Sequence, residues 1–403
     1  MPSTLRRTFL GTVVSGVVAG IAGCSSSCPD TDTPEPSHTV GTADGSAFET
    51  LPDGAWPSPR FDAANTGYTT VESPSPMPSI QWRSTLPVSS GDEAAPLTTP
   101  PIVADETVLV ATQRGMFGLS LRDGTERWRR DLVPATVESA LGYGEKLASP
   151  IATDGTAICP TADGVVALDI GDGSVLWRTD KVTGAGTPAR TGEGVVCPTA
   201  DGLTMLDTRD GSPRWTASVD ARDPVVADGM VVGGKDRTVA LDVATGQRRW
   251  TAPTGTHEHP VVADGTVYLG TGDGLVGRAL SDGSEQWRID RGRFLTPPVV
   301  TPETIYAVES PGEAGDATFA FDRVADGKPT PRWCSQVGSG AVTAAADDGL
   351  LTLQSAGLVA FTADYGDATW RYPLRDGLQP PAVLDGGLVT VSTDGVVAAL
   401  GGD

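Results

Sequence analysis

The sequence predicts an all-β protein, an eight-bladed β-propeller of four-stranded antiparallel blades whose ring is closed by a strand from the N-terminal part of the chain. Three observations predict this fold. The 403 residues include 50 Gly and 32 Pro, which separate short segments rich in Val, Thr, Leu and Ala. Tryptophan recurs at a nearly regular interval, and the last repeat lacks one strand that an earlier segment supplies.

Residues 1–23 have the features of an export signal. Arg6-Arg7 followed by Phe9-Leu10 is typical of a twin-arginine signal, which exports folded proteins. The apolar run 12–22 is shorter than the roughly 20 residues that span a bilayer. The run ends in Ile-Ala-Gly-Cys24, typical of a lipobox, so we expect Cys24 to carry the lipid. The alternative is a cleaved signal with an incidental cysteine.

The chain after the signal divides into two parts. Residues 24–50 are rich in Ser, Pro, Thr, Asp and Gly and contain few apolar side chains. Such a segment cannot bury enough surface to order itself, so we expect a flexible, lipid-anchored linker, in which Cys28 has no evident partner. Residues 51–403 form the propeller.

The repeat is a turn followed by a tryptophan. Asp-Gly, or a related pair ending in Gly, precedes a Trp by a few residues in seven copies, and Trp82 is an eighth copy without the turn. The intervals run from 35 residues, Trp215 to Trp250, up to 49 residues, Trp128 to Trp177. This period is typical of a propeller. The eight repeat tryptophans are Trp82, Trp128, Trp177, Trp215, Trp250, Trp287, Trp333 and Trp370.

One unit illustrates a blade. Residues 260–263, 267–271, 275–280 and 286–289 form four short strands separated by tight turns. Asp264-Gly265 is a typical turn pair, because Gly tolerates positive φ.

The two ends of the chain predict how the ring closes. Residues 382–384, 388–392 and 396–400 supply only three strands before the chain stops. Ile80–Thr85 supplies the fourth strand, which gives eight blades and removes two exposed sheet edges. The alternative is a ring of seven blades with one irregular unit looped out.

The repeats resemble the pyrroloquinoline-quinone (PQQ) repeat superfamily, which includes BamB-like lipoproteins. Its pattern of Ala, Gly six positions later and Trp four further on fits Ala167–Gly173–Trp177, and the copies ending at Trp250 and Trp370 fit as well. The segment 56–68 resembles the stretch before the first blade in such proteins. The resemblance implies that each indole packs flat on a neighbouring blade and that its N–H binds a backbone carbonyl.

The charge balance is strongly acidic, with 29 Lys and Arg against 51 Asp and Glu and a formal net charge of −22. This charge argues against nucleic-acid binding, which needs basic patches. The scarcity of Lys, with only four residues, resembles proteins of salt-loving archaea, in which molar salt screens an acidic surface. The alternative is an ordinary acidic exported protein.

The family also contains quinone-dependent dehydrogenases, whose chemistry needs a calcium ion, an Asp base and a flat aromatic floor. The resemblance implies that such an enzyme would have an adjacent Cys-Cys pair and an Asn at the metal. This chain has no adjacent cysteines, and its single asparagine, Asn65, precedes the blades. We therefore predict no catalytic residue and no cofactor; PQQ and calcium remain the alternative. Cys159 and Cys197 are expected to be small buried apolar residues.

Two sets of residues could still bind a cation. His257 and His259 are candidate metal ligands two residues apart, although no third ligand can be named, and a polar loop between blades is the alternative. Aspartates in the second loop of several blades share one face of the ring, although they also suit the turns themselves. They are Asp163, Asp201, Asp236, Asp273 and Asp394.

These features predict a non-enzymatic lipoprotein on the outer face of the cytoplasmic membrane, a scaffold for protein–protein interaction. Its expected partners are the membrane, through Cys24, and surface or secreted proteins, and we expect a monomer. The alternative is a PQQ- or metal-dependent quinoprotein oxidoreductase or a ligand sensor.

Overall fold

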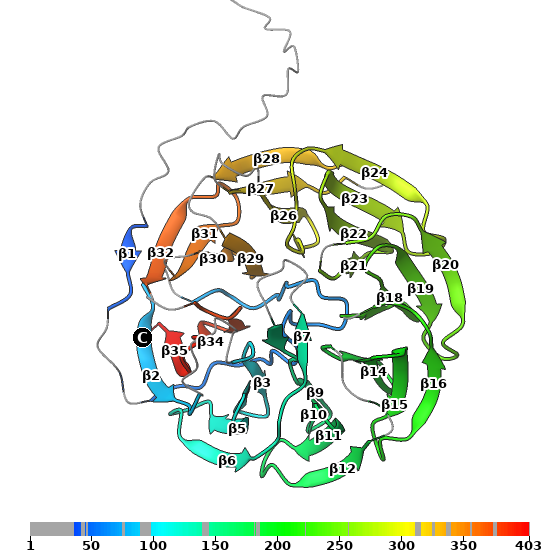
Figure 1. Ribbon diagram of the computed structural model, residues 1–403. Helices are drawn as coiled ribbons and strands as arrows, with labels where there is room; N and C mark the ends of the chain where they lie inside the picture. The colour runs from blue at the N-terminus through cyan, green and yellow to red at the C-terminus, as the bar shows by residue number, and fades with distance from the viewer. Residues whose placement is uncertain are drawn as a thin grey trace, which may run out of the picture.

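The structure, a computed structural model, forms a ring of eight sheets around a central axis (Figure 1). It describes residues 36–41, 45, 47–74, 77–88, 98–138, 145–180, 182, 186–221, 223–256, 258–310, 316–324, 327–335, 340–354, 357–373 and 377–402. The signal, with Arg6, Arg7 and Cys24, lies outside these residues. No membrane-spanning helix is found in the described part of the chain, where the regular elements are strands.

Each blade is an antiparallel sheet whose strands follow one another from the axis to the rim. Blades 1 to 3 consist of β3 (Ile102–Ala104), β4 (Thr107–Thr112), β5 (Gly115–Ser120) and β6 (Glu126–Arg130); β9 (Ile151–Thr153), β10 (Thr156–Thr161), β11 (Gly164–Asp169) and β12 (Val175–Thr179); and β13 (Ala189–Arg190), β14 (Gly194–Thr199), β15 (Gly202–Asp207) and β16 (Pro213–Ala217). Blades 4 and 5 consist of β17 (Val225–Ala227), β18 (Met230–Gly233), β19 (Thr238–Asp242) and β20 (Arg248–Ala252); and β21 (Val261–Ala263), β22 (Thr266–Thr271), β23 (Gly274–Ala279) and β24 (Glu285–Asp290).

Blades 6 to 8 complete the ring. They consist of β25 (Val299–Val300), β26 (Thr304–Glu309), β27 (Ala317–Asp322) and β28 (Thr330–Ser335); β29 (Gly340–Ala345), β30 (Gly349–Gln354), β31 (Gly357–Thr362) and β32 (Ala368–Pro373); and β33 (Ala382–Leu384), β34 (Gly387–Val391) and β35 (Val396–Gly401) with β2 (Ser79–Thr85). The predicted eight-bladed, all-β architecture is therefore confirmed, and the seven-bladed alternative is wrong.

Blade 5 has the four strands expected from its sequence, each within one residue of the predicted bounds. The turn between β21 and β22 places Asp264 at φ 46° and Gly265 at φ 70°. Positive φ at both central positions is the geometry of a type I′ hairpin, which matches the twist of the two strands.

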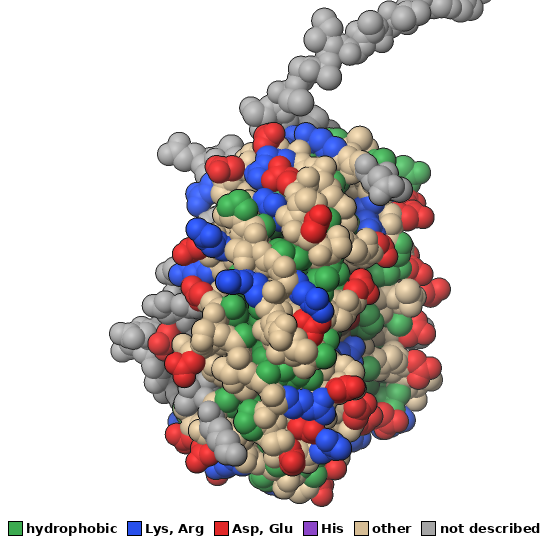
Figure 2. All heavy atoms as spheres, turned by 90° about the vertical axis from the view of Figure 1, so that its right-hand side faces the viewer, with side chains coloured by type: hydrophobic (Ala, Val, Ile, Leu, Met, Phe, Trp, Pro, Cys, Tyr) green, Lys and Arg blue, Asp and Glu red, His purple; other side chains and the backbone are tan. Residues whose placement is uncertain are grey.

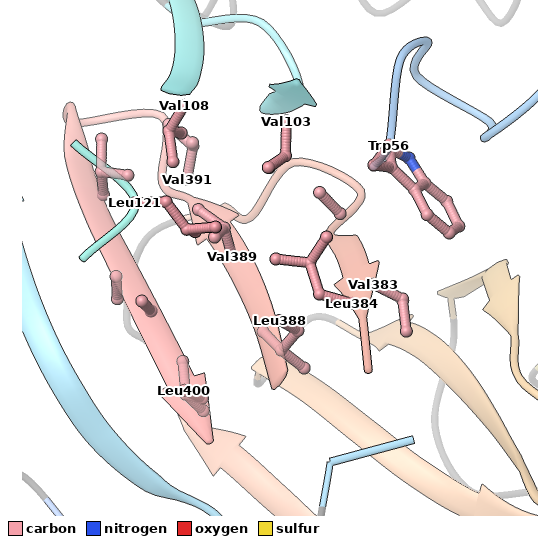
Figure 3. Close-up of a cluster of buried hydrophobic side chains, with 14 of the residues drawn as sticks. Trp56, Val103, Val108, Leu121, Val383, Leu384, Leu388, Val389, Val391 and Leu400 are labelled. Carbon is pink, nitrogen blue, oxygen red and sulfur yellow. The ribbon is translucent and has the colours of Figure 1, made fainter. Parts of the chain in front are cut away.

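Blade 8 closes the ring as predicted. β2 pairs antiparallel with β35, with Ile80 opposite Leu400 and Thr85 opposite Val396. The largest buried cluster surrounds this junction, where Val389 and Leu400 of blade 8 pack with Val103 and Val108 of blade 1 (Figure 3). β2 is thus joined to the last strand of blade 8 by backbone hydrogen bonds, and blades 8 and 1 share an apolar core.

Residues 37–50, which we call the strap, depart from the expected flexible linker. β1 (His38–Thr39) pairs parallel with β32, so blade 7 gains a fifth strand. Val40 and Phe48 are buried in the core around blade 8. The Gly45 N–H donates to Ile80 O of blade 8, and the Phe48 N–H donates to Arg122 O of blade 1. The packed part of the chain therefore begins before the expected boundary at residue 51.

A second unexpected segment, residues 53–69, crosses the channel, and we call it the plug. Figure 1 shows this blue stretch running through the middle of the ring. Its backbone makes hydrogen bonds of 2.6–3.0 Å with the innermost strand, or the residue after it, in seven of the eight blades. The blade residues that bind it are Val103, Ala152, Val226, Val262, Val300, Ala345 and Asp385.

The repeat tryptophans connect neighbouring blades. Six of them donate the indole N–H to a backbone carbonyl of the next blade, at 2.6–3.0 Å. These six are Trp82, Trp128, Trp177, Trp215, Trp250 and Trp333. Each also lies against the Gly of the next blade's turn, where an added Cβ would meet the ring at under 3.0 Å. Trp287 and Trp370 pack with the buried clusters around blades 5–6 and 8.

The alanine at the first position of the family pattern can be explained by the tryptophan that faces it on the adjacent strand. Ala167, Ala240 and Ala360 lie opposite Trp177, Trp250 and Trp370 on the adjacent strand. At the equivalent Gly118, an added Cβ would lie 2.3 Å from the ring of Trp128. In these blades the blade's own indole leaves room only for a small side chain, whereas blade 3 places Met205 opposite Trp215.

Candidate functional site

A cavity of about 330 Å³ lies on the ring axis, where the chain enters the innermost strands. Its walls are built by one repeated feature. In seven blades the innermost strand is directly preceded by proline: Pro101, Pro150, Pro188, Pro224, Pro260, Pro298 and Pro381. Proline is tolerated at the first residue of an edge strand, because no ladder partner needs its missing N–H.

The residue before each of these prolines lines the cavity. It occupies an equivalent position in each blade, so its side chain can be compared from blade to blade. Five of the seven are small or apolar: Pro100, Ser149, Thr187, Pro297 and Pro380. Asp223 of blade 4 and His259 of blade 5 are the titratable exceptions and belong to neighbouring blades. At this equivalent position the titratable side chains therefore belong to blades 4 and 5.

The plug forms the floor of the cavity through Arg60, Asp62 and Asn65. Arg60 is buried and donates from Nε to Asn65 O at 3.2 Å and from Nη2 to Pro298 O at 2.5 Å. Burial lowers the pKa of Arg60 to about 10, while Glu258 and Asp62 oppose this shift, so the guanidinium stays protonated at neutral pH. Asp62 accepts the Thr66 hydroxyl at 2.6 Å, which fixes the plug's own loop.

A hairpin inserted between blades 1 and 2 supplies a further part of the cavity wall. It consists of β7 (Thr136–Glu138) and β8 (Glu145–Leu147), and Figure 1 shows β7 close to the centre of the ring. Lys146 and Leu147 of β8 line the cavity. The ammonium of Lys146 lies 3.8 Å from Oδ2 of Asp223, whose Oδ1 accepts the Thr187 N–H at 3.1 Å. The insertion thus contributes the cation that faces Asp223.

His259 is the most unusual group in the cavity. Both of its ring nitrogens are shielded from solvent and have no hydrogen-bond partner, and the same is true of the hydroxyl of Thr296 from the next blade. Burial, and then the positive charge of Arg60, lower the pKa of His259, so its imidazole is neutral at pH 7. A neutral imidazole can donate one hydrogen bond and accept another. The pair therefore offers unused hydrogen-bonding capacity to a group that enters the cavity.

Of the two histidines considered as metal ligands, His259 lines the cavity, and His257 lies outside the described residues. Within the described part of the chain, no three His, Cys, Asp or Glu side chains gather to hold one ion. Asp163, Asp201, Asp236, Asp273 and Asp394 are exposed turn residues outside the cavity lining.

Cys159 and Cys197 are free and buried, as predicted. Burial raises the pKa of each thiol to about 12, so neither is a thiolate at neutral pH.

Several arginines on the rim are paired with carboxylates. Arg214 contacts Asp207 at 2.8 Å and Glu193 at 2.9 Å, and Arg288 contacts Glu285 at 2.7 Å. Figure 2 shows the resulting mixture of acidic and basic side chains on one side of the ring.

The closed ring of eight four-stranded blades, held by Trp–Gly contacts, defines a PQQ-like repeat β-propeller. The chain matches the family model described as "Outer membrane protein assembly factor BamB" over residues 78–288 and 234–330, more than half of its length. The chain therefore belongs to the BamB family. No curated protein sequence matches the chain.

Solved structures with the same fold include both non-enzymatic and enzymatic propellers. BamB from Moraxella catarrhalis has a TM-score of 0.59 and 17% identity, covering 79% of this chain and 100% of that chain. The quinohemoprotein alcohol dehydrogenase ADHIIG from Pseudomonas putida HK5 has a TM-score of 0.64 and 13% identity over 87% and 83% of the two chains. A europium-containing methanol dehydrogenase has a TM-score of 0.62 and 11% identity over 84% and 89%. At these identities the likeness shows the fold alone.

The cavity's residues do not fit a quinone with calcium. Calcium takes six to eight oxygen ligands. Of the carboxylates that line the cavity, however, Asp62 is hydrogen-bonded within the plug, Asp223 is paired with Lys146, and Glu258 interacts electrostatically with Arg60. The residues that line this cavity include no Phe, Tyr or Trp to form a flat floor. We therefore derive no redox step from this site.

Proposed function

We propose that the protein is a non-enzymatic propeller scaffold that binds other proteins through the face on which the axial cavity lies. The observation that carries this proposal is the cavity itself. It presents two unpaired polar groups, His259 and Thr296, in a wall otherwise made mainly of proline and small residues. A buried group without a partner is costly, so a side chain from a bound protein that supplies the missing hydrogen bonds gains affinity.

The ring and the plug suit this role because they hold the cavity walls rigidly. Backbone hydrogen bonds tie the floor to seven blades, so a partner need not order the site when it binds. We further propose that Cys24 carries lipid and that Arg6 and Arg7 direct twin-arginine export. The scaffold would then act as a monomer on the outer face of the cytoplasmic membrane.

Site-specific photo-crosslinking on native membranes tests the proposed binding face. Asp163 and Asp172 lie in the turns at opposite ends of β11, and both are exposed. A photoreactive residue at Asp163, on the cavity face, should give a discrete crosslinked protein that is lost in the His259→Ala variant. The matched residue at Asp172 should give none. Equal crosslinking from both positions, or none from Asp163, would overturn the proposal.

The second candidate function is a ligand sensor or a quinoprotein. The volume of the cavity, at the lower end of typical small-ligand pockets, favours a small ligand, although the lining residues do not fit a quinone with calcium. Absorbance of the protein purified without chelators separates the two functions. A bound quinone chromophore with stoichiometric calcium would favour the enzyme. Colourless protein that retains its crosslinked partner would favour the scaffold.

A further inference from the structure

Blade 3 is the one blade that makes no backbone hydrogen bond with the plug among the described residues. In six other blades one N–H of the innermost strand, at an equivalent position, donates to a carbonyl of the plug at 2.6–3.0 Å. The equivalent residue of blade 3 is Arg190 of β13. The six donors are Val103, Ala152, Val226, Val262, Val300 and Ala345.

The backbone of Arg190 therefore leaves a donor unused. The next residue, Thr191, donates its N–H to Gly194 O at 2.8 Å. Hydrogen-bonded and non-hydrogen-bonded pairs alternate along an antiparallel ladder, so the Arg190 N–H points away from β14 and towards the axis. In the described part of the chain no backbone carbonyl accepts it.

The plug leaves this strand uncovered because it turns at blade 3. Pro57 O accepts from blade 2 and Ala63 O accepts from blade 4, and residues 58–62 between them form a tight turn. Within the turn Phe61 has a φ of 71°, which is uncommon for a bulky residue. The cavity extends into the uncovered space, where both residues of β13 line it.

The side chain of Arg190 also differs from its equivalents. Arg190 is half-buried, lines the cavity, and has neither a hydrogen bond nor an ion pair with a described residue. The carboxylates of the cavity do not compensate it, because Asp62, Asp223 and Glu258 interact with other groups. Blade 3 thus brings an unpaired cation to the cavity. The other seven blades have apolar residues at this position: Val103, Ala152, Val226, Val262, Val300, Ala345 and Val383.

Further hydrogen-bond donors line the same cavity. Arg60 uses Nε and Nη2 for backbone carbonyls and leaves Nη1 without a partner among the described residues. The neutral imidazole of His259 and the Thr296 hydroxyl can each donate one hydrogen bond. A carboxylate suits this set of donors, because its two oxygens accept about four hydrogen bonds and can pair with a guanidinium through two of them.

The uncovered edge of β13 favours a polypeptide as the source of the carboxylate. A small free acid supplies a carboxylate alone, whereas a polypeptide also supplies the backbone groups that the plug gives to this edge in other blades. The plug closes the floor of the cavity, so a chain end fits better than a segment that must enter and leave.

We infer that Arg190 holds the C-terminal carboxylate of a bound polypeptide, which enters the cavity beside β13. This inference rests on the proposed function, in which the cavity face binds another protein, and it names the group that is recognised.

Two immobilised libraries of random hexapeptides test the recognised group. The peptides of one library end in a free carboxylate, and those of the other end in an amide. The full-length protein in detergent should retain peptides from the first library, and amidation of these peptides should weaken binding by roughly 10–100-fold. Retention of no peptide from the first library, or equal binding of the acid and amide forms, would overturn the inference.

Arg190→Gln tests whether this residue provides the selectivity. The variant removes the charge of an unpaired side chain, so its melting temperature should equal that of the natural protein. It should bind the acid and amide forms of a selected peptide equally, because the interaction that separates them is lost. The matched control is Arg248→Gln, at an exposed arginine of β20, which should keep the full preference. A preference unchanged in Arg190→Gln would contradict the assignment.

Succinate serves as the probe for a small free acid. It should compete only weakly with a selected peptide, because it lacks backbone groups to pair with β13. Succinate that binds as tightly as the peptide would assign the site to a free acid and overturn the choice of a polypeptide.

Crosslinking from Asp163 separates this inference from the proposed function. Both hold if the crosslinked partner is lost in Arg190→Gln as well as in His259→Ala. A partner that persists in Arg190→Gln but is lost in His259→Ala would overturn the carboxylate inference and leave the proposed function intact. If the natural protein gives no crosslink, the proposed function fails, and peptide selectivity that depends on Arg190 would still show that the carboxylate site exists.

Discussion

The indole ring of Trp177 lies so close to Gly211 of the next blade that a Cβ at Gly211 would be 2.5 Å from its Cε3 atom. The same contact recurs at six blade interfaces. Glycine is therefore required in the repeat for two separate reasons, its own positive φ and the ring that covers it.

The effect of the covering ring can be measured by two matched substitutions. Gly211 and Gly229 have similar φ values, 70° and 75°, but nothing lies within 4 Å of a Cβ at Gly229. Gly229→Ala should cost only the strain of a left-handed conformation, about 1 kcal/mol. Gly211→Ala should cost a further 1–3 kcal/mol or so for overpacking. Urea unfolding measures both, and equal losses would mean that the indole does not constrain the turn.

The strap should contribute to stability although it precedes the first blade. Phe48 is 5% exposed and packs in the core at blade 8. Phe48→Ala should lower the free energy of unfolding by about 3–5 kcal/mol. The exposed neighbour Glu49 is the control, and Glu49→Ala should change stability by no more than about 0.5 kcal/mol. Equal unfolding midpoints for the two variants would show that the strap is not packed in solution.

The neutral state of His259 predicts a loss of stability in acid. Burial lowers its pKa in the folded chain, whereas an unfolded histidine has a pKa of about 6.5. Below that pH the unfolded chain binds a proton that the folded chain excludes. The free energy of unfolding should therefore fall with decreasing pH, by up to about 1.4 kcal/mol per pH unit for this one proton.

His259→Gln isolates this contribution from those of the carboxylates. Denaturant unfolding at intervals between about pH 7 and pH 5 should show a shallower decline for the variant than for the natural protein. Parallel profiles would indicate that His259 is protonated in the folded chain.

The net charge of −22 predicts that salt stabilises the fold. The Debye length falls from about 10 Å at 0.1 M to about 3 Å at 1 M salt, which screens the repulsion among surface carboxylates. The melting temperature should therefore rise markedly between these concentrations in KCl. A melting temperature that is unchanged by salt would support an ordinary acidic exported protein rather than a salt-adapted one.

The blades could be predicted from the sequence because each one carries its own signal. The Trp interval, the Asp-Gly turns and the unpaired strand at residues 80–85 are local patterns, and together they define the ring and its closure. The plug could not be predicted, because it is held mainly by backbone hydrogen bonds to strands far along the chain. Such bonds place few demands on side-chain type.

The site was predicted only in part. His259 was identified, but for metal binding rather than as a neutral group against Arg60. The proline before the innermost strand of seven blades was visible in the sequence and marks the residues that line the cavity. Lys146 could not be placed, because only the folded hairpin brings it to Asp223 from a different blade.

The pairing of β2 with β35 determines when the ring can close during synthesis of the chain. A ribosome makes Ser79–Thr85 long before Val396–Gly401, so the closing strand waits without its partner while nearly the whole polypeptide is synthesised. The same holds for the plug, whose contacts span blades from the first to the last. The ring therefore cannot close before Val396–Gly401 has left the ribosome.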